Sequence, residues 1–215
     1  MDETMLPIVE GLLIEGVDYA GKTAVTDALM ELMLARRYKV YRRACFMHEH
    51  PIIDALLALA KTSDRMDVRD TCYTSSLLLD LSMPPLPAPA GYLLQERHVP
   101  TQIARNTFFY DDAVRWEVDV LTRLRRRFSS QVYLTSTLAT KRTRTRTRAP
   151  KSPRDALLAG DPVLHQRFDD FSREQLPTDE DWLIIDTSSL SVAQISHRIL
   201  DHIESHGVRV RHAGL

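Results

Sequence analysis

Short apolar runs alternate along this chain with longer segments whose apolar residues recur every three or four positions. The apolar runs cover residues 11–15, 39–46, 91–96, 131–136 and 181–186. Strands of a parallel sheet read as continuous apolar runs, and the connections between parallel strands are usually helices. The alternation therefore predicts an α/β fold of three layers, in which a five-stranded parallel sheet lies between helices.

The segments between and after the apolar runs carry the 3.6-residue period of helices. We predict helices over residues 22–36, 52–60, 67–82, 101–127, 155–173 and 192–205. The last helix should pack on the sheet through one apolar face, formed by Ile195, Ile199, Leu200 and Ile203. The fourth helix is predicted to end on cations that meet its negative end, namely Arg123, Arg125, Arg126 and Arg127.

The composition is that of an ordinary globular chain, with 215 residues, 44% of them hydrophobic, and a formal net charge of -1. These values predict a single domain over residues 1–215 and exclude fibrous and disordered classes. No apolar run approaches the roughly 20 residues that a membrane-spanning helix needs. The first residues include acidic Asp2 and Glu3 instead of a basic head. We therefore expect a cytoplasmic location and no membrane partner.

Residues 16–23 satisfy the phosphate-binding pattern G-x-x-x-x-G-K-[ST] and lie directly between a predicted strand and a predicted helix. The two glycines allow backbone N–H groups to turn inward onto phosphate oxygens, and the helix adds the positive end of its dipole. Lys22 is expected to bridge the terminal phosphates of ATP, and the Thr23 hydroxyl to coordinate Mg²⁺. ATP and Mg²⁺ are thus the predicted cofactors, and the predicted cofactor-binding residues of the loop are Gly16, Val17, Asp18, Tyr19, Ala20, Gly21, Lys22 and Thr23.

The segment over residues 14–23 resembles the opening of thymidylate kinases, in which a strand ending in Glu-Gly precedes a phosphate loop with an acidic residue at the position of Asp18. Glu96-Arg97-His98 resembles the Asp-Arg-Tyr or Asp-Arg-His element of that family, and residues 185–190 resemble its Ile-Asp-x-Ser segment near the adenine. The resemblance implies a P-loop kinase fold and phosphoryl transfer from Mg-ATP to a nucleoside monophosphate or a closely related small acceptor. One assembly that the resemblance implies is a homodimer, formed through helices that flank the sheet.

The resemblance assigns roles to residues around the phosphate loop. Asp18 would bind the acceptor hydroxyl or a metal-bound water, and Glu96 would act at the magnesium ion. Arg97 would bind the phosphoryl group in flight or the acceptor phosphate, because a guanidinium presents paired donors. An acceptor-binding region is expected over residues 46–90, and the predicted acceptor-binding residues are Asp18, Glu49, Arg97, Thr101, Arg105 and Asn106.

Residues 120–154 contain eleven Lys or Arg and no Asp or Glu, and residues 141–148 read KRTRTRTR. The segment follows the fourth predicted strand, where nucleotide kinases carry a lid that closes over the phosphates and excludes water. We predict an arginine-rich lid over residues 138–155, with Arg142 as its catalytic residue and with Arg142 and Arg146 binding ATP. A nucleic-acid-binding arm is disfavoured, because no aromatic side chains that stack on bases are interleaved with the arginines.

Departures from the family pattern leave the acceptor open. The family has an Ala-Asp-Arg element in the helix before the third strand, whereas residues 77–89 contain no arginine. One alternative is a deoxynucleoside kinase, since Glu96-Arg97 also resembles the Glu-Arg-Ser element of those enzymes and Glu49 lies where they carry their base. Another alternative is a regulatory or nucleic-acid-associated protein that binds nucleotide without metabolic turnover.

Overall fold

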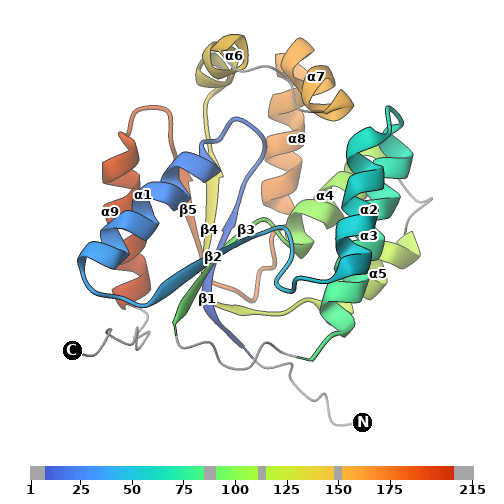
Figure 1. Cartoon of the computed structure of the whole chain (residues 1–215). Coiled ribbons are helices and arrows are strands. Elements are labelled where there is room, and N and C mark those ends of the chain that lie inside the picture. Colours follow the sequence, from blue (N-terminus) through green and yellow to red (C-terminus); the bar gives the residue numbers. More distant parts are fainter. Residues whose placement is uncertain (1–7, 85–90, 111–114, 148–151, 206–215) are drawn as a thin grey trace.

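The computed structural model describes residues 8–84, 91–110, 115–147 and 152–205 (Figure 1). Five parallel strands form one sheet in the order β2-β3-β1-β4-β5. They are β1 (Val9–Glu15), β2 (Val40–Ala44), β3 (Tyr92–Glu96), β4 (Phe128–Thr135) and β5 (Trp182–Asp186). The predicted α/β class and the parallel five-stranded sheet are confirmed.

β1 is the middle strand of the sheet and is buried from both sides. Its residues Leu12, Leu13 and Ile14 are at most 2% exposed, because helices cover both faces of the sheet. Full burial of such a side chain contributes about 1.5–3 kcal/mol. The phosphate loop that follows β1 is therefore anchored to a strand in the buried centre of the fold.

Two helices, α1 (Lys22–Ala35) and α9 (Val192–Ser205), cover one face of the sheet (Figure 1). The predicted apolar face of the last helix is confirmed, because its four side chains are at most 2% exposed. They belong to the same core cluster as Leu29 of α1 and Leu94 of β3. The helix that begins at Lys22 is thus held on the sheet along its length.

The opposite face carries α2 (Pro51–Thr62), α3 (Met66–Ser82), α4 (Val99–Tyr110), α5 (Arg115–Leu124) and α8 (Pro162–Glu174) (Figure 1). Leu13 and Leu93 of the sheet pack there with Val99 of α4 and Leu121 of α5. Aromatic rings join α4 to α8, since the centroids of Phe108 and Phe168 are 5.2 Å apart. No helix in the described part of the chain is long and apolar enough to span a membrane.

The prediction of one helix over residues 101–127 is wrong. The segment contains α4 and α5, and residues 111–114 lie outside the described ranges. Arg125 and Arg127 follow the end of α5 and form ion pairs with Glu180 at 3.0 Å and Asp179 at 3.1 Å. Arg126 donates a 2.7 Å hydrogen bond to the carbonyl of Met83. Arg125, Arg126 and Arg127 thereby fasten the start of β4 to neighbouring loops. Of the four cations predicted at a helix end, Arg123 lies in the last turn of α5.

The prediction of one helix over residues 155–173 is also wrong, because α7 (Pro153–Gly160) ends before α8 begins. Pro162 lacks the N–H that a continuous helix needs, and its ring clashes with the preceding turn. The Asp161 carboxylate accepts hydrogen bonds from the N–H groups of Val163 at 3.0 Å and Leu164 at 2.9 Å. Asp161 thereby caps the start of α8.

The basic segment after β4 forms helix α6 (Leu138–Thr147), which lies with α7 above the carboxyl edge of the sheet (Figure 1). Lys141 is 1% exposed and forms an ion pair with Asp169 of α8. Its Nζ also donates to Gln166 Oε1 at 3.0 Å. This buried contact fixes the rotation of α6 about its own axis. Residues 148–151 of the predicted lid lie outside the described ranges.

Candidate functional site

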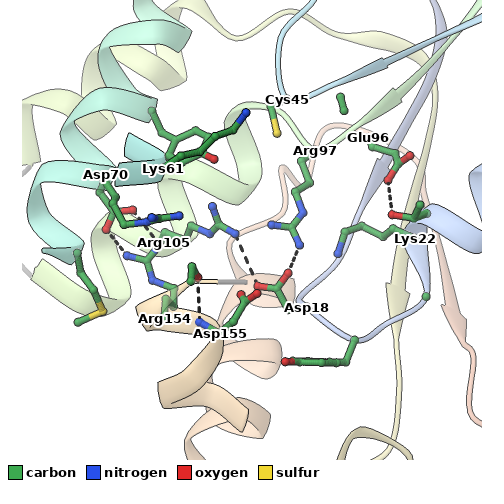
Figure 2. Close-up of a pocket in the computed structure, with 18 of the residues that line it drawn as sticks. Asp18, Lys22, Cys45, Lys61, Asp70, Glu96, Arg97, Arg105, Arg154 and Asp155 are labelled. Atoms are coloured by element: carbon green, nitrogen blue, oxygen red, sulfur yellow. Dashed lines mark hydrogen bonds and ion pairs between the residues drawn. The ribbon is translucent and has the colours of Figure 1, made fainter. Parts of the chain in front are cut away.

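A cavity of about 820 Å³ opens at the carboxyl edge of the sheet. Its walls come from the phosphate loop, the start of α1, the ends of β2 and β3, and helices α2, α3, α4 and α7. Figure 2 shows Lys22 and Glu96 on one side of it, Asp70 and Lys61 on the other, and Asp18 between them. Open parallel α/β sheets bind their ligands at this edge, where loops follow the carboxyl ends of the strands.

The phosphate loop has the backbone that the glycine pattern predicts. Gly16 and Gly21 have φ values of 136° and 93°, which side-chain-bearing residues rarely adopt. A Cβ on Gly16 would lie 2.2 Å from the carbonyl oxygen of Leu134, so the loop approaches β4 too closely for any other residue. Tyr19 also has a left-handed φ of 66°. The loop is therefore a closely packed turn in which two glycines are required.

Lys22 lies within the curve of the phosphate loop. Its Nζ donates to the carbonyl of Gly16 at 2.5 Å and to that of Val17 at 2.7 Å. Burial, followed by the nearby charge of Arg97, lowers the pKa of Lys22 to about 7. An anion bound beside the ammonium would reverse this shift. The position thus favours a ligand with negative charge in the loop.

Thr23 and Glu96 meet at the entrance of the loop, where the threonine hydroxyl donates to Glu96 Oε2 at 3.2 Å. Arg42 of β2 forms ion pairs with Glu96 and with Asp27 of α1. A hydroxyl and a carboxylate are hard oxygen ligands of the kind that Mg²⁺ prefers, and Mg²⁺ typically takes few protein ligands besides phosphate oxygens. No group of three or more His, Cys, Asp or Glu side chains able to hold a metal exists among the described residues. The pair fits a magnesium ion shared with a bound phosphate.

Asp18 lies between two guanidinium groups (Figure 2). Arg97 forms an ion pair with its Oδ1, and Arg105 Nη2 lies 3.7 Å from its Oδ2. Burial raises the pKa of the Asp18 carboxyl, but the charges of Arg97 and Arg105 outweigh burial and hold that pKa well below its usual value. Arg97 itself has a left-handed φ of 58°. Asp18 is therefore ionised and holds both guanidinium groups beside the phosphate loop.

The structure adds residues to the cavity wall for which the sequence analysis gave no individual role. Arg154 of α7 forms a two-pronged ion pair with Asp70 of α3, with Nη1 at 2.8 Å from Oδ1. Tyr110 donates a 2.6 Å hydrogen bond to the same carboxylate, and the Arg154 guanidinium lies 4.8 Å from the ring centroid of Phe109. Asp70 and Arg154 are 84 positions apart, so no local motif relates them.

Three predicted acceptor-binding residues lie outside the large cavity. Glu49 is exposed and pairs with Arg43 at 2.5 Å. Asn106 is buried in α4, where it donates to Thr74 Oγ1 at 3.1 Å and Glu117 Oε2 at 3.0 Å. Thr101 donates to the buried carboxylate of Glu15 beneath the phosphate loop. Arg105 and Arg97, in contrast, line the cavity as expected.

The arginines of α6 divide between two faces of the helix. Arg142 and Arg146 are exposed to solvent. Arg144 donates to the carbonyl of Tyr19 at 2.9 Å and to Thr187 Oγ1 at 3.0 Å. Its other nitrogen donates to the carbonyl of Thr187 at 3.0 Å. The structure therefore brings Arg144, and not the predicted Arg142 or Arg146, against the phosphate loop.

The segment after β5 also reaches the phosphate loop, because Thr187 Oγ1 donates to the carbonyl of Ala20 at 3.0 Å.

No protein-family model matches the chain, and no curated protein sequence matches it. A solved thymidylate kinase from Candida albicans superimposes with a TM-score of 0.64 at 16% sequence identity, over 93% of this chain and 92% of that one. The fold is thymidylate kinase-like. This agrees with the resemblance noted from residues 14–23 and extends it to the sheet and its covering helices.

Proposed function

We propose that this protein transfers the γ-phosphoryl group of Mg-ATP to a nucleoside monophosphate or a closely related small acceptor. The observation that carries the proposal is the meeting, in one cavity, of the phosphate-loop Lys22 with the Asp18-Arg97-Arg105 cluster. In the reaction an acceptor oxygen forms a bond to the γ-phosphorus while the bond between that phosphorus and the oxygen of ADP breaks. Such a transfer needs positioning and charge neutralisation more than covalent chemistry by the protein.

The donor nucleotide would bind along the phosphate loop. Loop N–H groups and Lys22 would hold the phosphates, and Thr23 with Glu96 would hold Mg²⁺, which neutralises phosphate charge when bound. The segment over residues 187–190 lies beside Ala20 of the loop and supports placement of the base there. Arg144 bridges that segment and Tyr19, so its donors are near the nucleotide end of the site.

The acceptor would bind in the part of the cavity between Asp18 and Asp70. Arg97 and Arg105 present guanidinium donors there, which match the geometry of an acceptor phosphate. Asp18 would receive the acceptor hydroxyl or a water molecule and would keep the two arginines apart. Two cations beside one carboxylate leave net positive charge, and this favours an anionic acceptor over a neutral nucleoside.

The deoxynucleoside kinase alternative needs a base on the attacking hydroxyl. Glu49, its candidate base, is exposed and paired with Arg43 outside the cavity. This arrangement favours the monophosphate kinase. The alternative of nucleotide binding without turnover predicts affinity for ATP with no release of ADP.

The test is a coupled assay of ADP release with Mg-ATP and, in separate reactions, nucleoside monophosphates, nucleosides and no acceptor. We expect release with one or more monophosphates, and Lys22→Ala should remove it. Release with nucleosides alone would establish the nucleoside kinase instead. Tight ATP binding with no release under any condition would contradict both kinase proposals.

A further inference from the structure

Two cations of the cavity wall lie away from the phosphate loop, at the corner between α2 and α3. Lys61 is in the last turn of α2, and Arg69 is in the first turn of α3. Figure 2 shows Lys61 and Asp70 across the cavity from Lys22, with Asp18 and Arg97 between them. The corner is therefore remote from the place where a γ-phosphoryl group would lie.

Most of the carboxylates that line the cavity have arginine partners. Asp18 pairs with Arg97 and Arg105, and Asp70 pairs with Arg154. Glu96 and Asp27 pair with Arg42 of β2. These contacts bring cations and carboxylates together across the middle of the cavity and at the end where Thr23 and Glu96 lie.

Lys61 and Arg69 differ from the cations that pair with these carboxylates. Within the described residues, neither cation lies at ion-pair distance from a carboxylate. Arg69 is half-buried, and its hydrogen bond to the carbonyl of Ser63 is long at 3.4 Å. Lys61 is exposed on the same wall of the cavity. An anion bound at this corner would be attracted by both positive charges.

The surface beside this corner suits a flat ring. Tyr73 of α3 lines the cavity and stacks on Phe46 with 6.3 Å between ring centroids and an interplanar angle of 11°. Met66 of α3 adds apolar surface to the cavity wall. An acceptor with its phosphate at Arg97 and its ring against Tyr73 would extend toward Lys61 and Arg69.

We propose that the acceptor carries a second anionic group, a carboxylate or a phosphate, at the end remote from its accepting phosphate, and that Lys61 and Arg69 bind this group. The inference rests on the proposed function and names its substrate class: a nucleotide with an additional negative charge on its base or on its sugar. The carboxylate would come from a substituted base and the phosphate from a second sugar position.

The test uses matched nucleotides in which only the second charge changes. Thymidine 5′-monophosphate is compared with 5-carboxy-2′-deoxyuridine 5′-monophosphate for the base, and with thymidine 3′,5′-bisphosphate for the sugar. Affinity is measured by calorimetry with Mg²⁺ and a non-hydrolysable ATP analogue, and turnover by ADP release. We expect at least one of the two nucleotides with a second anionic group to bind about tenfold tighter than thymidine 5′-monophosphate, or more, because that group would accept charge-assisted hydrogen bonds.

The variants Lys61→Gln and Arg69→Gln should each reduce this preference, and the double variant should abolish it while thymidylate affinity changes less than about twofold. Arg65→Gln is the matched control, because Arg65 is exposed at the same corner, pairs with Asp67 and does not line the cavity. Equal affinity for all three nucleotides, or a preference that survives in the double variant, would overturn the inference. If the wild-type protein turns over thymidylate but shows no preference for a second anionic group, the proposed function stands and the inference fails. If the wild-type protein shows the preference and the double variant loses it, but no nucleotide is turned over, the proposed function alone is contradicted.

Discussion

The carboxylate of Asp80 accepts a hydrogen bond from the ring of His98, with Nε2 at 3.2 Å from Oδ2, and His98 is the residue directly after Arg97. The same carboxylate accepts the backbone N–H groups of His48 at 2.8 Å and Met47 at 3.1 Å. Asp80 is 0% exposed. One buried carboxylate of α3 thus ties the segment after β2 to the segment that carries Arg97.

Asp80→Asn should destabilise the fold by about 2–4 kcal/mol, because an amide donor would face buried N–H donors that now find an acceptor. Urea unfolding at neutral pH measures the change. Asp64→Asn is the control, since Asp64 is exposed, and it should have little effect. Equal midpoints for the two variants would show that Asp80 does not hold these segments together.

Asp80 also predicts a pH dependence. Burial raises the pKa of its carboxyl, but the hydrogen bond and charge of His98 and the backbone N–H groups outweigh burial and lower that pKa below its usual value. A group whose folded pKa is lowered contributes stability above its unfolded pKa of about 3.9 and loses it as the pH falls through the folded value. The wild-type chain should therefore lose more unfolding free energy than Asp80→Asn between pH 5 and acid conditions, measured by urea titrations.

Lys22 predicts a rise of stability with pH as well, but at higher pH and for the opposite reason, because its buried charge costs stability whereas that of Asp80 adds to it. Burial lowers its folded pKa to about 7, so the unfolded chain binds more protons between that value and about 10.4. The cost of the buried ammonium is therefore full below pH 7 and diminishes as the pH rises. We expect Lys22→Met to be more stable than wild type at pH 6.5 and to lose that advantage toward pH 10. An advantage that does not change with pH would contradict the lowered pKa.

Binding of ATP should restore the charge of Lys22, because phosphate oxygens favour the ammonium form. At pH 8 the wild-type chain should take up protons on binding Mg-ATP. Calorimetry in two buffers of different ionisation enthalpy measures this uptake. The uptake should be absent in Lys22→Met, and equal uptake in the two proteins would remove Lys22 from the phosphate site.

Arg97→Ala should raise the acceptor KM and lower kcat, since two charge-assisted hydrogen bonds to phosphate oxygens are lost. We expect about a hundredfold loss in kcat/KM or more, in steady-state assays with a monophosphate acceptor. Arg43→Ala is a suitable control, because Arg43 lies outside the cavity and pairs with exposed Glu49. Unchanged kinetics in Arg97→Ala would show that Arg97 contacts neither the acceptor phosphate nor the γ-phosphoryl group of ATP.

Arg144→Ala should raise the KM for ATP several-fold, because its guanidinium joins the carbonyl of Tyr19 to Thr187 beside the phosphate loop. Arg142→Ala is the matched control on the same helix, since Arg142 is exposed. Initial rates over a range of ATP concentrations compare the two. A larger effect from Arg142 would support the assignment made from the sequence, in which Arg142 binds ATP.

The sequence by itself determined those features that depend on residues close together in the chain. The phosphate loop is one, because its two glycines, its lysine and its threonine lie within eight consecutive residues between a strand and a helix. The apolar face of α9 is another, since the helical period alone places Ile195, Ile199 and Ile203 together. Local periodicity did not detect that Asp161 and Pro162 divide one predicted helix into two.

Only the tertiary structure decided which cations of α6 face the phosphate loop. Lys141 is drawn into the protein by Asp169, 28 positions away, and this contact sets the rotation of α6. Arg144 follows three residues later and shares the inward face, whereas Arg142 is turned about 100° away. The pairing of Asp70 with Arg154 likewise joins two helices that are distant in the chain. The alternating arginines of α6 are equivalent in the sequence. They differ in the structure because the buried ion pair of Lys141 with Asp169 fixes the rotation of the helix and turns only some of its side chains inward.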